Sequence, residues 1–224
     1  MGMKKIGVVL SGCGVFDGAE IHESVLTLLA IDRAGAKAVC MAPDVEQMHV
    51  INHHNGEEMP DEKRNVLVES ARIARGEIRD INAIKADDID ALVFPGGFGA
   101  AKNLSSFAEE GEDCKVHPEV MRLVKEFIAK QKPQAALCIA PAMMAKIYEG
   151  ESVNPTLTIG NDKDGISMVE AMGSKHQECS ARDFVLDKEN NIVSTPAYMV
   201  GKSISEVAEG IEKTITELIK MIPH

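Results

Sequence analysis

Residues 5–42 read KIGVVLSGCGVFDGAEIHESVLTLLAIDRAGAKAVCMA, and this stretch decides the fold class. The apolar run Lys5–Ser11 predicts a strand that is followed at once by glycines. Apolar residues then recur at helical spacing over Glu20–Ala34, until Gly35 ends the helix. Lys37–Ala42 is a second β-rich run. A strand, a helix and a strand in this order form a right-handed unit with parallel strands, so the sequence predicts an α/β fold.

The same alternation of strands and helices continues to the end of the chain. Further elements are expected as strands at Ala91–Phe94, Gln134–Leu137, Leu157–Ile159, Ser174–Cys179, Phe184–Asp187 and Ile192–Thr195, the last two joined by a turn at Asn190-Asn191, and as helices at Lys63–Arg75, Pro118–Lys130, Ala140–Tyr148 and Ser203–Met221. No internal repeat and no linker divides the sequence. We therefore predict one domain over residues 1–224, with a mostly parallel central sheet sandwiched by helices and an insertion around residues 44–85.

The charge of the chain argues against two classes of partner. The 224 residues include 24 Lys+Arg and 35 Asp+Glu, and 24 − 35 gives a net charge of −11. A nucleic acid or an anionic membrane surface needs a basic face, so neither is expected as a partner. Hydrophobic residues make up 45% of the chain, which is enough for a core. No apolar run approaches the roughly 18 residues of a membrane-spanning helix.

The cysteines indicate free thiols. There are five of them, an odd number, and no Cys-x-x-Cys pair occurs, so neither a disulfide framework nor a zinc finger is predicted. The residues before the first strand lack the long apolar region and the cleavage site of a signal peptide. We therefore expect a protein of the reducing cytoplasm.

Three predicted strands end in sequences that suit a binding site. They are followed by Gly12-Cys13-Gly14, by Pro95-Gly96-Gly97 and by Cys138-Ile139-Ala140-Pro141. Ligands of open parallel sheets bind at the carboxyl ends of the strands, so these loops are expected to build one pocket. Cys138, at a turn from strand to helix, is the candidate nucleophile, and the helix N-terminus would lower the pKa of its thiol. The alternative is a buried cysteine packed as a small apolar side chain.

Two further features could assist such a thiol. The N–H groups of Gly96-Gly97 could face a developing oxyanion, although the pair could also be an ordinary turn. Glu20 and Glu23 begin a helix three residues apart, and one carboxyl could reach inward and exchange a proton with the thiol. The alternative is that these acids only favour the helix N-terminus electrostatically.

No metal or nucleotide is predicted. His49, His53 and His54 lie in a polar stretch without fixed ligand spacing, which favours a solvated loop. The Gly12-x-Gly14 pair lacks the third glycine of a dinucleotide loop. We therefore expect no cofactor.

Several stretches together resemble the ThiJ/PfpI superfamily, the class I glutamine amidotransferase-like proteins. The resemblance, which runs from Met3 to about Met221, is carried by Lys5–Ser11, Gly18-Ala19-Glu20 with Glu23, Arg33-Ala34-Gly35, Pro95-Gly96-Gly97 with Asn103-Leu104, and Leu137-Cys138-Ile139-Ala140-Pro141. Within this superfamily, residues 11–18, 50–53, 95–105 and 195–199 look closely like the ElbB-like branch, named for enhancing lycopene, an isoprenoid. The resemblance implies a flavodoxin-like fold and a homodimer.

The resemblance also implies an activity. ElbB-like proteins are described as glyoxalases that convert glyoxal to glycolate without glutathione, so the implied partner is a small aldehyde substrate. By analogy Cys138 is the nucleophile and Glu23, rather than Glu20, is the acid beside it. The N–H groups of Gly97 and Ile139 would form the oxyanion hole, and Cys13, Glu20 and Gly96 could line the pocket.

One departure from the superfamily leaves other functions open. Many relatives carry histidine directly after the cysteine, where this chain has Ile139, and neither His117 nor His176 is predicted near the pocket. A Cys-His-acid triad is therefore not expected, which makes amidase or deglycase activity a weak alternative. The other alternative is a non-catalytic redox sensor or partner-binding protein, in which Cys13 could resolve a sulfenic acid on Cys138.

Overall fold

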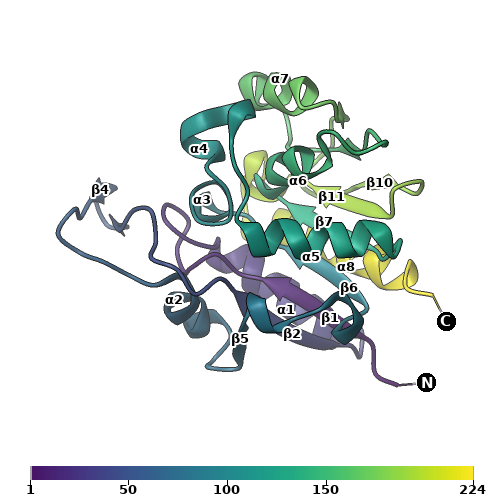
Figure 1. The fold of residues 1–224 in the computed structure, drawn as a ribbon, viewed down its shortest axis with the longest axis horizontal. Coiled ribbons are helices and arrows are strands. Elements are labelled where there is room, and N and C mark those ends of the chain that lie inside the picture. The colour runs from purple at the N-terminus through teal and green to yellow at the C-terminus, as the bar shows by residue number, and fades with distance from the viewer. Residues whose placement is uncertain (1, 224) are drawn as a thin grey trace.

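A computed structural model describes residues 2–223 as a central sheet between two layers of helices (Figure 1). The sheet has seven strands in the order β10-β11-β7-β6-β1-β2-β5. Their bounds are β1 Lys5–Val9, β2 Lys37–Ala42, β5 Ile78–Asp80, β6 Ala91–Phe94, β7 Gln134–Leu137, β10 Val185–Asp187 and β11 Ile192–Thr195. Only β10 pairs antiparallel with its neighbour, so the predicted mostly parallel α/β sheet is confirmed.

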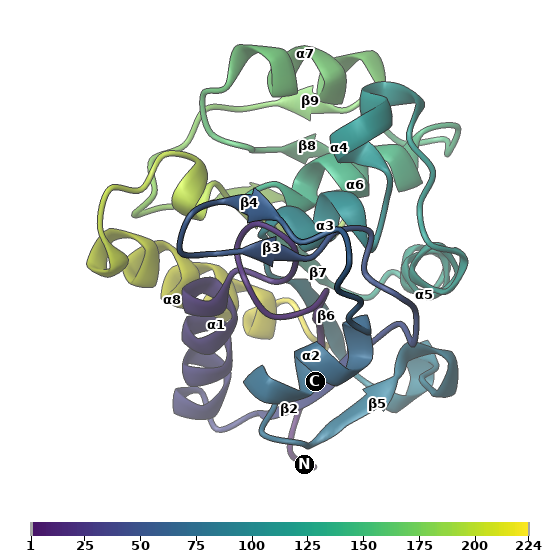
Figure 2. The ribbon, with the colours of Figure 1, turned by 90° about the vertical axis from the view of Figure 1, so that its left-hand side faces the viewer.

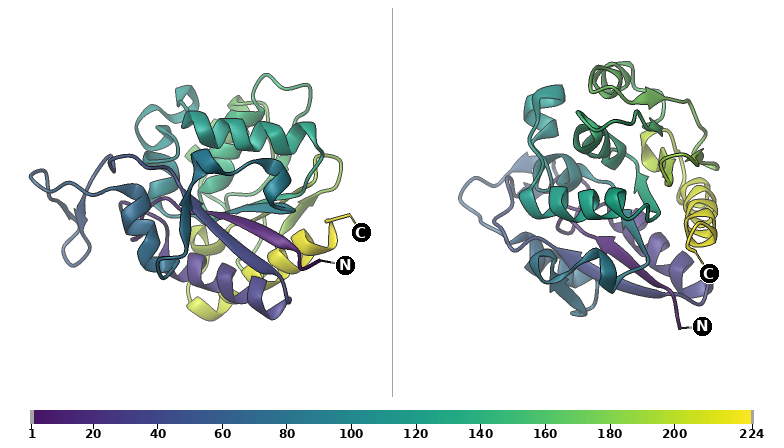
Figure 3. Two further views of the ribbon diagram at one scale, coloured as in Figure 1. Left: turned by 60° about the horizontal axis from the view of Figure 1, so that its bottom comes forward. Right: turned by 45° about the vertical axis from the view of Figure 1, so that its right-hand side comes forward.

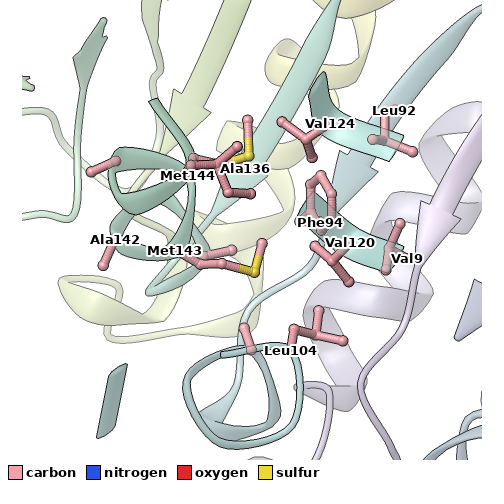
Figure 4. Packing of buried hydrophobic residues seen from close by; sticks show 14 of the residues in the cluster. Val9, Leu92, Phe94, Leu104, Val120, Val124, Ala136, Ala142, Met143 and Met144 are labelled. Atoms are coloured by element: carbon pink, nitrogen blue, oxygen red, sulfur yellow. The ribbon is translucent and has the colours of Figure 1, made fainter. Parts of the chain in front are cut away.

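Helices cover both faces of this sheet, as Figure 3 shows. On one face α1 (Ile21–Arg33) packs beside α8 (Ile204–Lys220), and both bury aliphatic side chains against the sheet. On the other face lie α5 (Pro118–Ala129) and α6 (Ala140–Tyr148). This second core is centred on the fully buried ring of β6, which Figure 4 shows between valines of α5 and methionines of α6: Phe94, Val120, Val124, Met143 and Met144.

Helix ends follow from local side chains. Glu20 caps α1 by accepting a hydrogen bond from the N–H of Glu23, and Ser203 caps α8 in the same way through Glu206. Pro118 is the first residue of α5, where a missing N–H costs nothing. The strand hairpin β10–β11 turns through Asn191, whose φ of +54° is a conformation that asparagine tolerates, so the predicted turn is present.

The segment predicted as an insertion, residues 44–85, divides into two parts. The first holds the short hairpin β3 (Ile51–Asn52) and β4 (Glu57–Glu58), which projects from the body of the molecule (Figure 1). The second holds α2 (Val66–Ile73) and β5, and β5 pairs with β2 at the edge of the central sheet. The insertion is therefore shorter than predicted, because its second half belongs to the α/β layers.

Smaller elements complete the fold around the central sheet. They are the helices α3 (Phe98–Lys102), α4 (Phe107–Glu110) and α7 (Lys163–Ala171), the strands β8 (Thr156–Leu157) and β9 (Lys175–His176), and four short 3-10 turns, η1 (Ile81–Ala83), η2 (Ala86–Asp88), η3 (Gly111–Asp113) and η4 (Ala197–Met199). β8 and β9 pair with each other in a separate two-stranded sheet, so the longer strands predicted there are reduced to two residues each. None of the helices within residues 2–223 has the length and apolar character needed to cross a membrane.

Candidate active site around Cys138

Cys138 lies in the one-turn junction between β7 and α6. Its backbone has a φ of +59°, a left-handed conformation that is unusual for a residue with a Cβ atom. Its N–H donates to the carbonyl of Thr195 on β11 at 2.9 Å, which holds the turn against the neighbouring strand. The residue is only 8% exposed. The fold therefore keeps a strained turn at this position and presents the thiol to a largely closed interior.

Glu23 reaches the thiol from the first turn of α1. The residue is fully buried, and its carboxylate lies beside the Cys138 side chain over Gly96. Its Oε2 accepts from the N–H of Gly96 at 2.9 Å, and its Oε1 accepts from the N–H of Tyr198 at 3.3 Å. Glu20 has a different role, because its Oε2 caps α1 at 2.7 Å from the Glu23 nitrogen. The structure therefore brings Glu23, and not Glu20, against the thiol.

The glycines after β6 allow this close approach. A Cβ on Gly96 would lie 2.4 Å from the Cβ of Cys138 and 2.7 Å from Oε2 of Glu23, so a larger residue has no room there. Gly97 has a φ of +91° and packs its backbone directly against Glu20. The N–H groups of Gly97 and Ile139 both hydrogen-bond the Cys138 sulfur. These are the two donors predicted to form an oxyanion hole, and they converge on the nucleophile.

The electrostatics differ from the sequence-based expectation of a low thiol pKa. Burial raises the pKa of Cys138 well above its ordinary value of 9.0, and the charge of Glu23 raises it further. The N–H groups of Gly97 and Ile139 act in the opposite direction, but they are outweighed. The expectation failed because it weighed the helix N-terminus and not the loss of water around the sulfur.

The pKa of the Glu23 carboxyl is raised as well. Burial raises its pKa from 4.5 to about 7, helped by the charge of Glu20 and opposed by the N–H groups of Gly96 and Tyr198. A carboxyl that titrates near neutral pH can both accept and return a proton. Because it lies beside the thiol, the pair can pass one proton from sulfur to carboxylate when a reactive electrophile enters.

Cys13 lies in a different environment from Cys138. The charges that act on its thiol are those of Glu69, Arg72 and Asp17, whereas Glu23 acts on Cys138. Burial raises the pKa of Cys13, and all five cysteines are free thiols. The geometry thus joins Cys138, Glu23, Gly96, Gly97 and Ile139, and it leaves Cys13 on the side of α2.

Tyr198 is a site residue that pattern reasoning did not single out. Its N–H binds Glu23, and its hydroxyl lies 2.8 Å from Nδ1 of His22 on the surface of α1. Residues 195–199 belong to the stretches that resemble the superfamily, and this was the only signal for Tyr198. The residue types alone do not indicate that its backbone N–H binds Glu23.

The other histidines serve elsewhere. His117 accepts from the N–H of Glu119 at the start of α5, and His176 lies in β9. Over the described part of the chain, no three His, Cys, Asp or Glu side chains gather as a metal site would require. A cavity of about 560 Å³ beyond η4, lined by Arg182, Val200 and Lys202 among other residues, includes neither Cys138 nor Glu23.

Comparisons with known proteins identify the relatives of this chain. A model of the DJ-1/PfpI family matches residues 13–195. The ES1 protein homolog of Rattus norvegicus is 43% identical over 97% of this chain and 84% of its own, and the human glutamine amidotransferase-like class 1 domain-containing protein 3 is 42% identical over 97% and 83%. A crystal structure from Ehrlichia chaffeensis, described as an isoprenoid biosynthesis protein with an amidotransferase-like domain, has a TM-score of 0.91 at 38% identity and covers 97% of this chain and 99% of that one.

These relatives correct one prediction and confirm another. The expected cytoplasmic location is wrong, because the rat and human relatives are both named as mitochondrial proteins. The flavodoxin-like fold implied by the resemblance is confirmed by the superposition on the Ehrlichia chaffeensis structure. With a family model over most of its length and relatives above 40% identity, the chain belongs to the DJ-1/PfpI family.

Proposed function

We propose that this protein is a cofactor-independent glyoxalase, a lyase that converts glyoxal and water to glycolate through the Cys138 thiol. The observation that carries the proposal is the position of the buried Glu23 carboxylate beside Cys138, since a Cβ on Gly96 would meet both Oε2 of Glu23 and the Cβ of Cys138. A nearly closed site suits a two-carbon substrate, which needs few contacts.

The proposed reaction begins with proton transfer and addition. Cys138 passes its proton to Glu23 as the sulfur bonds to one aldehyde carbon of glyoxal, and the carbonyl π pair moves to oxygen. The N–H groups of Gly97 and Ile139 then turn from the sulfur to the new oxyanion. Because the oxygen has taken the π pair, its protonation by Glu23 gives a neutral hemithioacetal.

The second half is an internal redox step followed by hydrolysis. Glu23 removes the hydrogen from the attacked carbon as a proton and delivers it to the neighbouring carbonyl oxygen, which gives an enediol. It then moves the hydroxyl proton of the attacked carbon to the neighbouring carbon, so that the carbonyl of a thioester forms. The attacked carbon is thereby oxidised to a thioester and its neighbour reduced to an alcohol, so no external oxidant is needed. Water cleaves the carbon–sulfur bond, releases glycolate and restores the Cys138 thiol.

Two alternatives fit the site less well. A redox-sensing thiol is normally exposed and of low pKa, whereas Cys138 is buried and its pKa is raised. An amidase or deglycase must protonate a leaving amine, and by the superfamily resemblance a histidine directly after the cysteine is expected for that step, where this chain has Ile139.

Turnover of glyoxal by the purified protein tests the proposal. Cys138→Ala and Glu23→Gln are each expected to lower kcat by at least about 100-fold, the usual contribution of a general acid–base group or more. Cys179→Ser is the matched control, because Cys179 is a partly buried free thiol outside the site. Full glycolate production by the Cys138→Ala protein would falsify the mechanism.

The proposal extends to assembly and pathway. Ile21, Val25 and Leu29 are between 40% and 48% exposed and, at a spacing of four, lie along one face of α1. Such a face supports a homodimer, which sedimentation can measure. A link to isoprenoid biosynthesis rests on the description of the Ehrlichia chaffeensis relative.

A further inference from the structure

The β3–β4 hairpin projects from the fold, yet it contacts the loop after β1 through the side chain of His53 and the N–H of Ile51. Figure 2 shows the hairpin beside the purple loop that follows β1. His53, the first residue after β3, makes the contact: its Nε2 accepts from the N–H of Phe16 at 3.2 Å, and its ring centroid lies 5.0 Å from that of Phe16. The contact thus joins the hairpin to residues 13–18, the Cys13–Gly18 loop.

The loop leaves room for the His53 ring, and the hairpin fixes the orientation of this ring. A Cβ on Gly14 would lie 2.5 Å from Nε2 of His53, so a residue without a side chain makes room for the ring. Nδ1 lies 3.0 Å from the carbonyl of Ile51 and donates to it, because Nε2 must keep its lone pair for Phe16. Asp17, 2% exposed, accepts from the N–H of Ile51 at 2.7 Å and lies 3.8 Å from Nε2.

From this loop the contacts continue to the oxyanion donors. The carbonyl of Val15 accepts from the N–H of Phe98 at 2.8 Å, and that of Gly18 accepts from the N–H of Gly99 at 2.9 Å. Both hydrogen bonds are made by the two residues that follow Gly97 in the sequence. Gly97 also packs against the loop, because a Cβ on Gly97 would lie 2.4 Å from the Gly18 carbonyl oxygen. The position of the loop therefore sets the position of the Gly97 N–H, which binds the Cys138 sulfur.

We propose that His53 is a positioning residue of the Cys138 site, which holds the Cys13–Gly18 loop against Gly97 through its hydrogen bond to the Phe16 N–H. This deepens the proposed function and rests on it for the catalytic consequence. Lys102 also reaches the loop, at 3.2 Å from the Phe16 carbonyl, but it comes from α3 itself and leaves the Phe16 N–H to His53. The hairpin thus contributes to the site without touching the substrate.

Three variants separate this role from a general effect on the hairpin. His53→Phe keeps a ring next to Phe16 but cannot accept a hydrogen bond. His53→Gln restores an acceptor at about the position of Nε2, so it is the rescue variant. His54→Phe is the matched control, because His54 is exposed and its hydrogen bond in the turn is made by its backbone N–H.

Amide hydrogen exchange of Phe98 and Gly99 is the first readout. We expect both amides to exchange about 5- to 10-fold faster in His53→Phe, as for the loss of one hydrogen bond. His54→Phe and His53→Gln should exchange nearly as the unaltered protein does. The second readout is alkylation by iodoacetamide, which should become faster at Cys138 but not at Cys179. With glyoxal, kcat should fall more than KM changes.

The outcomes judge the two proposals separately. Unchanged exchange of Phe98 and Gly99 in His53→Phe overturns the positioning role, and so does an equal increase in His54→Phe. If His53→Phe does not fold, the comparison of His53→Ala with His53→Gln decides, because His53 is 36% exposed and Ala only removes the ring. Absence of glyoxal turnover in the unaltered protein contradicts the glyoxalase proposal, and the exchange result still decides the role of His53.

Discussion

Cys138 and Glu23 share a buried site in which the carboxylate raises the affinity of the thiol for its proton. The charge of Glu23 is the second cause, after burial, of the raised pKa of the thiol. Proton transfer from the thiol to the carboxylate leaves only one negative charge in the site, because the carboxyl becomes neutral when the sulfur becomes charged. A thiolate and a carboxylate therefore do not stand side by side. The reactive thiolate is thus made only together with its acid, which suits a buried nucleophile without histidine.

Replacing Glu23 by glutamine should therefore lower the pKa of Cys138, because the neighbouring negative charge is gone while burial stays. The pH dependence of iodoacetamide alkylation, followed by mass spectrometry of the Cys138 peptide, should shift to lower pH in Glu23→Gln. Cys179 in the same samples is the internal control, since burial and Asp183 raise its pKa and Glu23 does not contribute. An unchanged or upward shift at Cys138 would show that Glu23 does not govern the thiol.

Some residues of the site could be predicted from the sequence, and others depended on how the chain packs. Cys138 and Gly96 could be predicted from the local sequence. Cys138 lies between the end of a strand and a helix with proline in its first turn, and Gly96 belongs to a glycine pair that follows a strand. Glu23 could be preferred over Glu20 only through the resemblance, since both acids begin the same helix and the direction of a side chain depends on packing. The direction of the thiol pKa was missed because burial is a property of the folded molecule.

At the scale of elements, Asn103 at the end of α3 joins three segments that carry the site. Its Nδ2 donates to the carbonyls of Ser11 at 2.8 Å and Asp17 at 2.9 Å, and its Oδ1 accepts from the N–H of Met48 at 3.0 Å. The side chain is 9% exposed, so these backbone groups have little access to water. The loop after β1, the segment before β3 and α3 are thus connected through one amide.

Asn103→Ala should cost about 2–4 kcal/mol of unfolding free energy, because several buried backbone groups lose their partner. Urea unfolding measures this cost. Asn55→Ala is the control: its side chain also hydrogen-bonds, to Glu57, but on the exposed hairpin, where water replaces the lost contact. Equal effects of the two substitutions would contradict a structural role for Asn103.

Predictability of the elements followed their length and burial. β2, β6, β7, β11 and α6 were predicted with the bounds they have in the structure, because each is apolar and bounded by turn residues. α7 was missed, since Lys163-Asp164-Gly165 is polar and contains glycine. Its one local signal was Asp162, which caps the helix by accepting from Gly165. Strands of two or three residues such as β3, β4 and β5 carry too little periodicity for detection.

For the whole molecule, the buried Glu23 makes stability depend on pH. Its pKa rises from 4.5 to about 7 on folding, so the folded state keeps a proton that the unfolded state releases in this range. The stabilisation by the neutral carboxyl is complete below pH 4.5 and is lost as the pH rises through 7. A shift from 4.5 to about 7 corresponds to about 3 kcal/mol.

We therefore expect the unfolding free energy, compared with that of Glu23→Gln, to fall by about 2–3 kcal/mol between pH 5 and pH 8.5. Urea unfolding of both proteins across this range gives the difference, and the comparison removes the pH effects of the other 34 acidic residues, 35 − 1. A difference that stays constant or grows with pH would show that Glu23 is ionised in the folded protein at pH 5.

The two outer strands of the sheet have a consequence for how copies of this protein meet. β5 and β10 are three residues long, and the N–H of Thr156 donates to the Asp187 carboxylate at the end of β10 at 2.7 Å. Strands this short offer another polypeptide few unpaired backbone groups, so sheet-to-sheet growth into open-ended fibres is disfavoured. Self-association is thereby directed to the helical faces, where contacts can close on themselves as a finite assembly.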